Sequence, residues 1–172
     1  MPRELIAPRQ AITSLSELLR ATLQFGQCER ITLAEELTVV SHYLALEQMR
    51  HEGRLQLEQT IEPAALTWVI PPFAVQTLVE NAVNHGIAQL TAGGVVTIRA
   101  SVQAEHLLVE VTNPGRIQPN ERSTGLGLRN TRARLALLFG TEATLVLDQK
   151  CEQQVRAYLS VPRSSEKLPA RS

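Results

Sequence analysis

A run of nine residues, Leu78 to Gly86, places two amides, a carboxylate and an imidazole close together on one predicted helix. At about 100° per residue, the aliphatic side chains of this helix share one stripe, formed by Val75, Leu78, Val79, Ala82 and Val83. The polar side chains gather opposite, namely Thr77, Glu80, Asn81 and Asn84. A carboxylate beside amides suits a magnesium-bound polyphosphate, because Mg²⁺ prefers oxygen ligands and keeps several waters and substrate oxygens. A surface helix with a solvated polar face is the alternative for this segment alone.

A pair of glycines, Gly125 and Gly127, directly precedes a second predicted helix, residues 129–139. Glycines permit close approach of the backbone, and the free N–H groups at a helix start favour a phosphate. Arg129 and Arg132 add positive charge nearby. The pattern is neither a Walker loop nor a full dinucleotide fingerprint, and a glycine pair alone also fits an ordinary loop.

Between these two segments, a predicted strand runs into the turn Asn113-Pro114-Gly115. The Asn113 amide is placed to read the edge of a base. Asn-Pro-Gly is also ordinary turn chemistry, so this segment alone leaves both interpretations open.

Taken in order, the three segments resemble the ATP-binding catalytic domain of sensor histidine kinases, within the superfamily of gyrase, mismatch-repair and heat-shock ATPases. The similarity is greatest to the LytS/YehU-like branch. LVENAVNHG is similar to that family's N box, VTNPG to its first glycine box and TGLGLRNTRARL to its second. The likeness extends over roughly residues 12 to 162, and several ordered motifs over that length argue against a chance match.

The resemblance assigns roles to residues of these motifs. It implies that Asn81 contacts Mg²⁺ and phosphate, and that Glu80 assists the attacking group, so these two are the expected catalytic residues. Asn113 matches the position of the adenine-reading aspartate. The implied ATP-binding residues are Asn81, Asn84, His85, Asn113, Gly115, Thr124, Gly125, Leu126, Gly127, Leu128 and Arg129.

The chain departs from the family pattern at three points. Asn84 stands where relatives often carry a phosphate-reaching lysine, and Asn113 replaces an aspartate, so both contacts lose a charge. The family's phosphorylated histidine lies in a segment ending Phe-Asn-x-Leu-Asn, and this sequence contains no such segment. His42, His51, His85 and His106 are its only histidines, and none has that setting. Only a short connection, residues 116–124, is available for a lid.

Composition and charge narrow the range of partners. Seventeen basic and seventeen acidic side chains cancel, which argues against the basic footprint of a nucleic-acid-binding protein. The longest uncharged run, residues 63–79, is divided by two prolines and is not a convincing membrane helix. The N-terminus has no apolar signal core.

Cys28 and Cys151 form no metal pattern and are interpreted as reduced thiols, although sequence leaves a disulfide open.

The periodicity predicts the elements that position these motifs. Residues 12–24 form an amphipathic helix, and a second helix begins at Thr32, with Glu35 completing a capping box. Residues 54–61 alternate as a strand, and two hairpins pair 95–100 with 107–112 and 143–147 with 155–161 around a loop at 148–154. We expect an α/β sandwich in which a mixed, mostly antiparallel sheet carries helices on one face, preceded by N-terminal helices. The resemblance implies that this is the Bergerat-type ATP-binding fold.

Three parts are expected along the chain. Residues 1–50 form a helical segment, 51–162 the ATP-binding domain and 163–172 a disordered tail. The first helix is either half of an internal helical hairpin or, as the resemblance favours, the remnant of a dimerisation bundle with an exposed apolar face.

The resemblance implies a protein histidine kinase that uses ATP and Mg²⁺ and passes phosphate to a response regulator, often one of the LytTR type. The full-length kinase is expected to be a homodimer, in the cytoplasm except for an upstream membrane or sensory region. Two alternatives remain: a nucleotide-binding regulatory module without kinase activity, which the missing histidine favours, and a gyrase-type ATPase.

Overall fold

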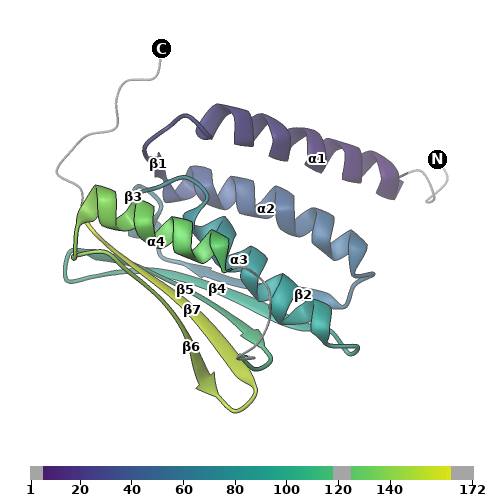
Figure 1. Ribbon diagram of the computed structural model, residues 1–172. Coiled ribbons are helices and arrows are strands. Elements are labelled where there is room, and N and C mark those ends of the chain that lie inside the picture. The colour runs from purple at the N-terminus through teal and green to yellow at the C-terminus, as the bar shows by residue number, and fades with distance from the viewer. Residues whose placement is uncertain (1–5, 118–124, 164–172) are drawn as a thin grey trace.

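A five-stranded sheet forms the base of the molecule in the computed structural model, which describes residues 6–117 and 125–163 (Figure 1). The strand order across the sheet is β2 (Leu55–Ile61), β4 (Gly94–Gln103), β5 (His106–Pro114), β7 (Gln154–Pro162) and β6 (Thr144–Cys151). β2 and β4 are parallel, whereas the other neighbours are antiparallel. The expected mixed, mostly antiparallel sheet is therefore confirmed.

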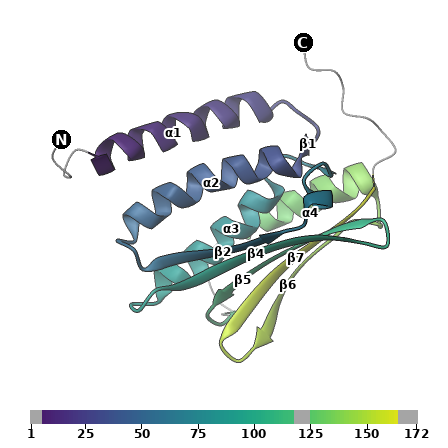
Figure 2. The same ribbon diagram turned by 180° about the vertical axis from the view of Figure 1, so that it is seen from behind.

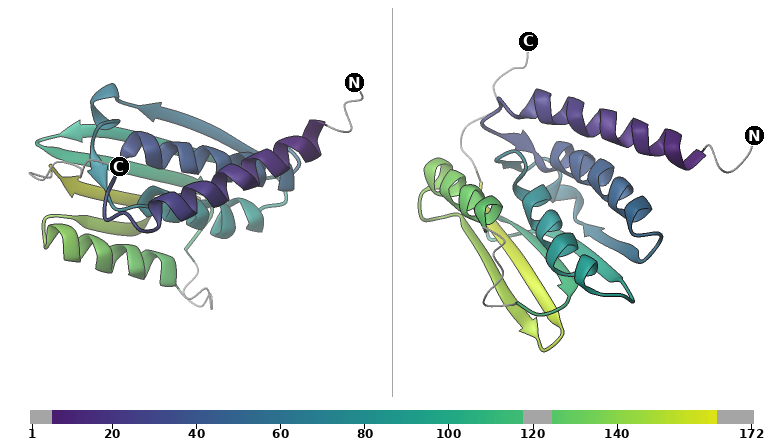
Figure 3. Two further views of the ribbon diagram at one scale, coloured as in Figure 1. Left: turned by 90° about the horizontal axis from the view of Figure 1, so that it is seen from above. Right: turned by 45° about the vertical axis from the view of Figure 1, so that its right-hand side comes forward.

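The helices lie on one face of this sheet. Seen from behind in Figure 2 and from above in Figure 3, three of them form a layer directly against it: α2 (Leu33–Arg50), α3 (Ala74–His85) and α4 (Leu126–Phe139). α1 (Ile6–Phe25) packs on the side of α2 that faces away from the sheet. Short 3₁₀ turns occupy Pro63–Ala65 and Ile87–Gln89. The predicted two-layer sandwich with preceding helices is confirmed.

Strand alternation explains how the sheet and helices share a core. Inward side chains of β4 and β5, such as Val96, Ile98, Val109 and Val111, are fully buried. They face the apolar stripe of α3, in which every residue of the predicted set is at most 1% exposed. The hydrophobic effect therefore fixes which side of α3 faces the sheet and leaves its polar side outward.

Local signals set most of the element ends. The Thr32 hydroxyl accepts from Glu35 N and the Glu35 carboxylate accepts from Thr32 N, so the predicted capping box is present. The β4–β5 hairpin turns through Ala104 and Glu105, both with positive φ. The loop expected at 148–154 is wrong. β6 and β7 stay paired as far as Cys151 opposite Gln154, because their backbone pairing continues through the polar residues of both strands.

Two additional strands were not predicted from the sequence. β1 (Ile31–Thr32) pairs antiparallel with β3 (Val69–Ile70), and Leu33 N donates to Trp68 O at 2.8 Å. This pair ties the start of α2 to the segment before α3. α2 also buries Leu33, Val40 and Leu44 in the main core, so the division drawn at residue 50 stays a proposal.

The first helix combines features of both sequence interpretations. Leu18, Ala21 and Phe25 of α1 pack against Val39 of α2, as in an internal hairpin. Four apolar side chains of the same helix remain exposed, by 48 to 79%: Ile12, Leu15, Leu19 and Leu23. α1 is thus held on the domain along one side and presents an apolar stripe on the other.

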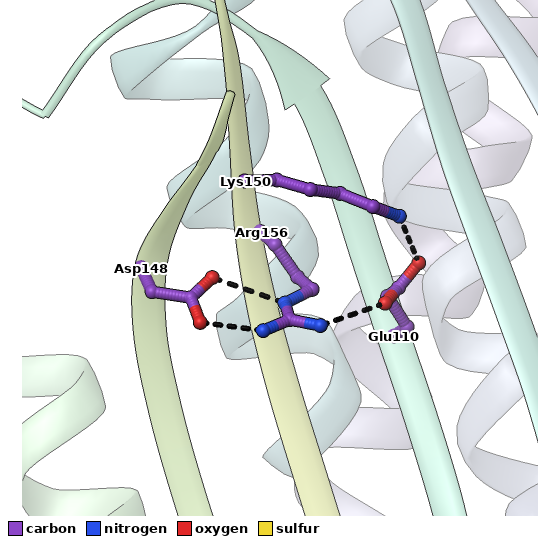
Figure 4. Close-up of polar contacts among 4 residues, drawn as sticks. All are labelled: Glu110, Asp148, Lys150 and Arg156. Atoms are coloured by element: carbon purple, nitrogen blue, oxygen red, sulfur yellow. Dashed lines mark hydrogen bonds and ion pairs between the residues drawn. The ribbon is translucent and has the colours of Figure 1, made fainter. Parts of the chain in front are cut away.

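The face of the sheet away from the helices carries an ion-pair network (Figure 4). Arg156 on β7 binds both oxygens of Asp148 on β6, at 3.0 and 2.6 Å, and lies 3.6 Å from Glu110 on β5. Lys150 reaches the other oxygen of Glu110 at 2.9 Å. The hydrogen bonds from Arg156 hold the pKa of Asp148 below its usual range. These exposed cross-strand pairs add modestly to the alignment of the last three strands.

Within the described residues, no helix is both long and apolar enough to cross a membrane. Cys28 and Cys151 are free thiols, as interpreted from the sequence. Of the expected disordered tail, 163–172, only Arg163 is among the described residues, and its N–H donates to Glu105 O at 3.0 Å. Most of the short lid segment, 118–124, also lies outside the described residues.

Candidate nucleotide site

The polar side of α3 lines a cavity of about 210 Å³ that it shares with the start of α4. α3 contributes Glu80, Asn81, Asn84 and His85, together with Thr77, which the sequence analysis had placed on this side without a role. α4 and its preceding residue contribute Gly125, Leu126, Gly127 and Leu128. The N box and the second glycine box, some forty residues apart in sequence, therefore meet in one site.

The two helices approach closely at this cavity because a glycine stands at the contact. A Cβ added to Gly127 would lie 3.1 Å from the Thr77 methyl group. One turn further along α4, the Thr131 hydroxyl donates to the Thr77 hydroxyl at 3.4 Å. Gly125 precedes α4 with φ 48°, a left-handed conformation that glycine adopts without strain. The start of α4 therefore lies beside the polar face of α3.

A second cavity, of about 450 Å³, lies at the C-terminal end of α3, next to the first. His85 borders both cavities. The remaining lining comes from three separate turns: Gly86, Gln89, Leu90, Pro114, Gly115, Arg116 and Gln153. Of these, only Gly115 was expected to contact nucleotide. The β5–β7 ladder, which sets Pro114 opposite Gln154, is what brings Gln153 to this position.

Asn113 lies beneath this second cavity and does not line it. Its side chain is buried, with 3% exposure, and Nδ2 donates to Pro114 O at 2.9 Å. A Cβ on Gly86 would come within 2.2 Å of that Nδ2, so a glycine is required there. The Asn113 side chain packs under Gly86 and Gly115, and direct reading of adenine by this amide stays a prediction.

Glu80 is held in place by a neighbour on its own helix. Gln76 Nε2 donates to Glu80 Oε1 at 2.7 Å, one turn away. The start of the same helix is bound by Glu36 from α2, whose carboxylate accepts from Phe73 N at 2.8 Å and Gln76 N at 3.0 Å. Glu36 is fully buried, and this burial raises its pKa to about 7, although the backbone N–H groups and Arg134 oppose the rise.

Two predicted residues remain, Arg129 and Thr124. Arg129 is exposed on α4 and lines neither cavity; its N–H donates to Gly125 O as part of the first helical turn. Thr124 lies outside the described residues. The roles of all the site residues remain predictions at this point.

The residues present fit a magnesium–nucleotide complex. The donors of the smaller cavity are amide and carboxylate oxygens, the ligand type that Mg²⁺ prefers. The N–H groups at the start of α4 suit phosphate oxygens. The larger cavity is large enough to admit a planar base, and its wall combines apolar carbons with polar side chains.

Comparisons with known proteins agree with this geometry. The histidine kinase family model matches residues 4–55. The chain is 30% identical to the sensor protein LytS of Enterococcus faecalis, covering 95% of this chain and 30% of that protein. It is 33% identical to the sensor histidine kinase BtsS of Escherichia coli K12, covering 91% of this chain and 28% of that protein.

The chain belongs to the LytS/BtsS family of sensor histidine kinases. It corresponds to the catalytic domain of that family, and it spans less than a third of the length of these two relatives. The resemblance predicted from the sequence motifs is thereby confirmed.

Solved structures show the same fold at lower sequence identity. The catalytic domain of histidine kinase ThkA matches with a TM-score of 0.60 and 17% identity, over 78% of this chain and 96% of that one. Full-length ShkA in complex with AMPPNP matches with a TM-score of 0.58 and 16% identity, over 94% of this chain and 38% of that one. The LytS/BtsS family domain described above therefore has the architecture of histidine kinase catalytic domains.

Proposed function

We propose that this domain binds ATP with Mg²⁺ and transfers the γ-phosphoryl group to a histidine on a dimerisation helix supplied from outside the sequence described. The observation that carries the proposal is the meeting of Glu80 and Asn81 with the start of α4 around one cavity. Family membership supports the same chemistry, and the AMPPNP bound to the structurally similar ShkA supports ATP as the nucleotide.

Each part of the site has a role in this proposal. The base lies in the cavity around His85 and Gly115, and the phosphates lie against the N–H groups following Gly125. Asn81 holds Mg²⁺ through its amide oxygen. Bound there, Mg²⁺ neutralises charge on the phosphate oxygens. Asn113 supports the base from beneath the cavity floor.

The transfer itself depends on positioning and charge neutralisation. A nitrogen of the acceptor imidazole forms a bond to the γ-phosphorus while the bond to the bridging oxygen of ADP breaks. The imidazole N–H proton passes to Glu80, which acts as the base. The product is a phosphohistidine, and we propose that a response regulator of the LytTR type receives its phosphoryl group. Full-length proteins of this kind are proposed to act as homodimers, with the present domain on the cytoplasmic side.

Calorimetric titration with magnesium-ATP, followed by transfer of labelled γ-phosphate to a bundle fragment carrying an acceptor histidine, tests the proposal. The wild type is expected to bind and to transfer. Asn81→Ala is expected to lower transfer by about a thousandfold, as for loss of a charge-stabilising group. Gln48→Ala, at an exposed position on α2, is the control and is expected to behave as the wild type.

The same experiment separates the other functions. Failure to bind nucleotide overturns the proposal. Binding without transfer to any acceptor identifies a regulatory nucleotide-binding module, which the neutral Asn84 and Asn113 favour. Phosphate release without an acceptor identifies a gyrase-type ATPase in which Glu80 activates water.

A further inference from the structure

We propose that Glu36 and Gln76 are positioning residues that hold Glu80 in place for phosphoryl transfer, through hydrogen bonds that start on α2 and end in the nucleotide site. This inference rests on the proposed function, because the role of Glu80 as base comes from it. The contacts themselves run from a buried carboxylate on one helix to a cavity-lining carboxylate on another.

The first link closes the start of α3 from outside that helix. Phe73, the residue before α3, has φ 63° and no side-chain cap of its own. The first N–H groups of a helix have no partner within the helix and require one elsewhere. Glu36 supplies it from α2, using one oxygen for Phe73 and the other for Gln76. These two hydrogen bonds involve residues three apart in sequence. They restrain both the position of α3 along its axis and its rotation about that axis, relative to α2.

The Glu36 carboxylate is buried, so its oxygens must be paired for the contact to be stable. Glu36 has no exposed surface, and an isolated buried carboxylate is strongly unfavourable. Its partners are the N–H groups of α3 and, at longer range, the guanidinium of Arg134 on α4, which itself donates to Pro72 O at 3.0 Å. Elements α2, α3 and α4 are thus joined around one carboxylate, directly before the residues that line the site.

The second link passes through Gln76. Its backbone N–H is held by Glu36, and its side chain reaches one helical turn onward to Glu80. Gln76 Oε1 is buried and finds no hydrogen-bond partner among the described residues. An orphaned buried oxygen costs on the order of 1–3 kcal/mol, and a leucine would fill the same space without that cost. The amide therefore contributes mainly through its contact with Glu80.

The consequence for catalysis is geometric. Gln76 engages one oxygen of the Glu80 carboxylate, which limits rotation of that group in the cavity. A base must lie within hydrogen-bond reach of the proton that it accepts. Glu36 fixes the helical turn from which Gln76 extends, so a change at α2 is transmitted to the orientation of Glu80 without any contact between α2 and nucleotide.

The test compares Gln76→Leu and Glu36→Gln with the wild type in magnesium-ATP binding and in transfer to the acceptor bundle fragment. Both variants are expected to lower the transfer rate about tenfold, as for a small misplacement of a reacting group, with the nucleotide dissociation constant unchanged. Gln48→Leu, an exposed amide on α2, is the matched control and is expected to transfer as the wild type.

Epistasis with Glu80 separates positioning from a general structural effect. In a Glu80→Gln background, Gln76→Leu is expected to cause no further loss, because the group that it positions is already gone. The same loss in both backgrounds overturns the proposal.

Glu36→Gln keeps an acceptor oxygen and the side-chain volume, and thermal unfolding verifies that each variant folds.

The outcomes also distinguish this proposal from the proposed function. A wild type that transfers, with variants that transfer equally well, overturns the positioning role alone. A wild type that neither binds nor transfers overturns both.

Discussion

The two helices that line the site begin in opposite ways. α3 begins at Phe73 under a fully buried carboxylate from α2, which occupies N–H groups of its first turn. α4 follows Gly125, which provides no side-chain cap, and the first residues of α4 line the cavity. One helix start is closed by the protein, and the other is suited to a phosphate. The difference shows how the same backbone feature serves anchoring in one helix and binding in the other.

The two helices also differ in how firmly they pack: α3 is more deeply buried than α4. α3 buries an entire apolar stripe, whereas α4 buries only Leu128, Thr131 and Leu135 and exposes Leu137 by 85%. Contacts of α4 with its surroundings include single hydrogen bonds from Arg132 to Leu145 O and from Arg134 to Pro72 O. α3 is therefore the fixed wall of the site, and α4 is the more weakly held one.

The largest expected effect comes from the stripe of α3. Leu78→Ala leaves a cavity in the main core and is expected to lower the free energy of unfolding by about 3 kcal/mol. Leu137→Ala on α4 makes the same chemical change at an exposed position and is expected to change it by less than about 0.5 kcal/mol. Chemical denaturation of both variants measures the difference. Equal losses would mean that α4 is anchored as firmly as α3.

A smaller effect concerns the closed start of α3. Because burial raises the Glu36 pKa from 4.5 to about 7, the native state keeps a proton that the unfolded chain releases in this range. The contribution of this group to the free energy of unfolding therefore falls as pH rises from 4.5 to 7. In the wild type, the free energy of unfolding is expected to fall between pH 5 and pH 7.5. In Glu36→Gln this fall is expected to be smaller by on the order of 2 kcal/mol.

Urea denaturation of the wild type and Glu36→Gln at both pH values measures this effect. Arg134 faces the same carboxylate, so Arg134→Met provides a comparison: it removes the charge that opposes the rise and is expected to steepen the dependence on pH. Identical pH dependence in the wild type and in Glu36→Gln would show that Glu36 has the same pKa in both states.

The smallest effect concerns the attachment of α4. Arg132→Met removes the hydrogen bond from its Nε to Leu145 O, 2.9 Å long, and keeps most of the aliphatic length. A loss of about 1 kcal/mol in the free energy of unfolding is expected. Arg129→Met, on an exposed part of the same helix, is the control. No difference between the two variants would show that packing alone holds α4.

Most of the fold was predictable because its signals are local. The Thr32–Glu35 capping box, the aliphatic stripe of α3 and the alternation in β4 and β5 all act over a few residues. The role of Glu36 was not predictable, because its partners lie 37 and 40 residues further along the chain. A charged residue inside an amphipathic helix looks solvated until the neighbouring helix is placed.

The site divides in the same way. The cavity around Glu80, Asn81 and Gly127 is formed by residues that two sequence motifs already contain. The second cavity draws on Gln89, Arg116 and Gln153, which come from separate turns and carry no motif. The pairing of β5 with β7 brings Arg116 and Gln153 together, and these two strands are not consecutive in sequence.

The short strand pair β1–β3 bears on how hybrid proteins could be assembled from this domain. It ties Ile31 to Ile70, while the residues between Phe25 and Ile31 form the connection from α1. A fusion joined within that connection retains α2, its buried carboxylate and the β1–β3 pair, which holds both in place relative to α3. A fusion joined after Arg50 replaces all three, and a foreign helix would then have to supply a carboxylate at the position of Glu36.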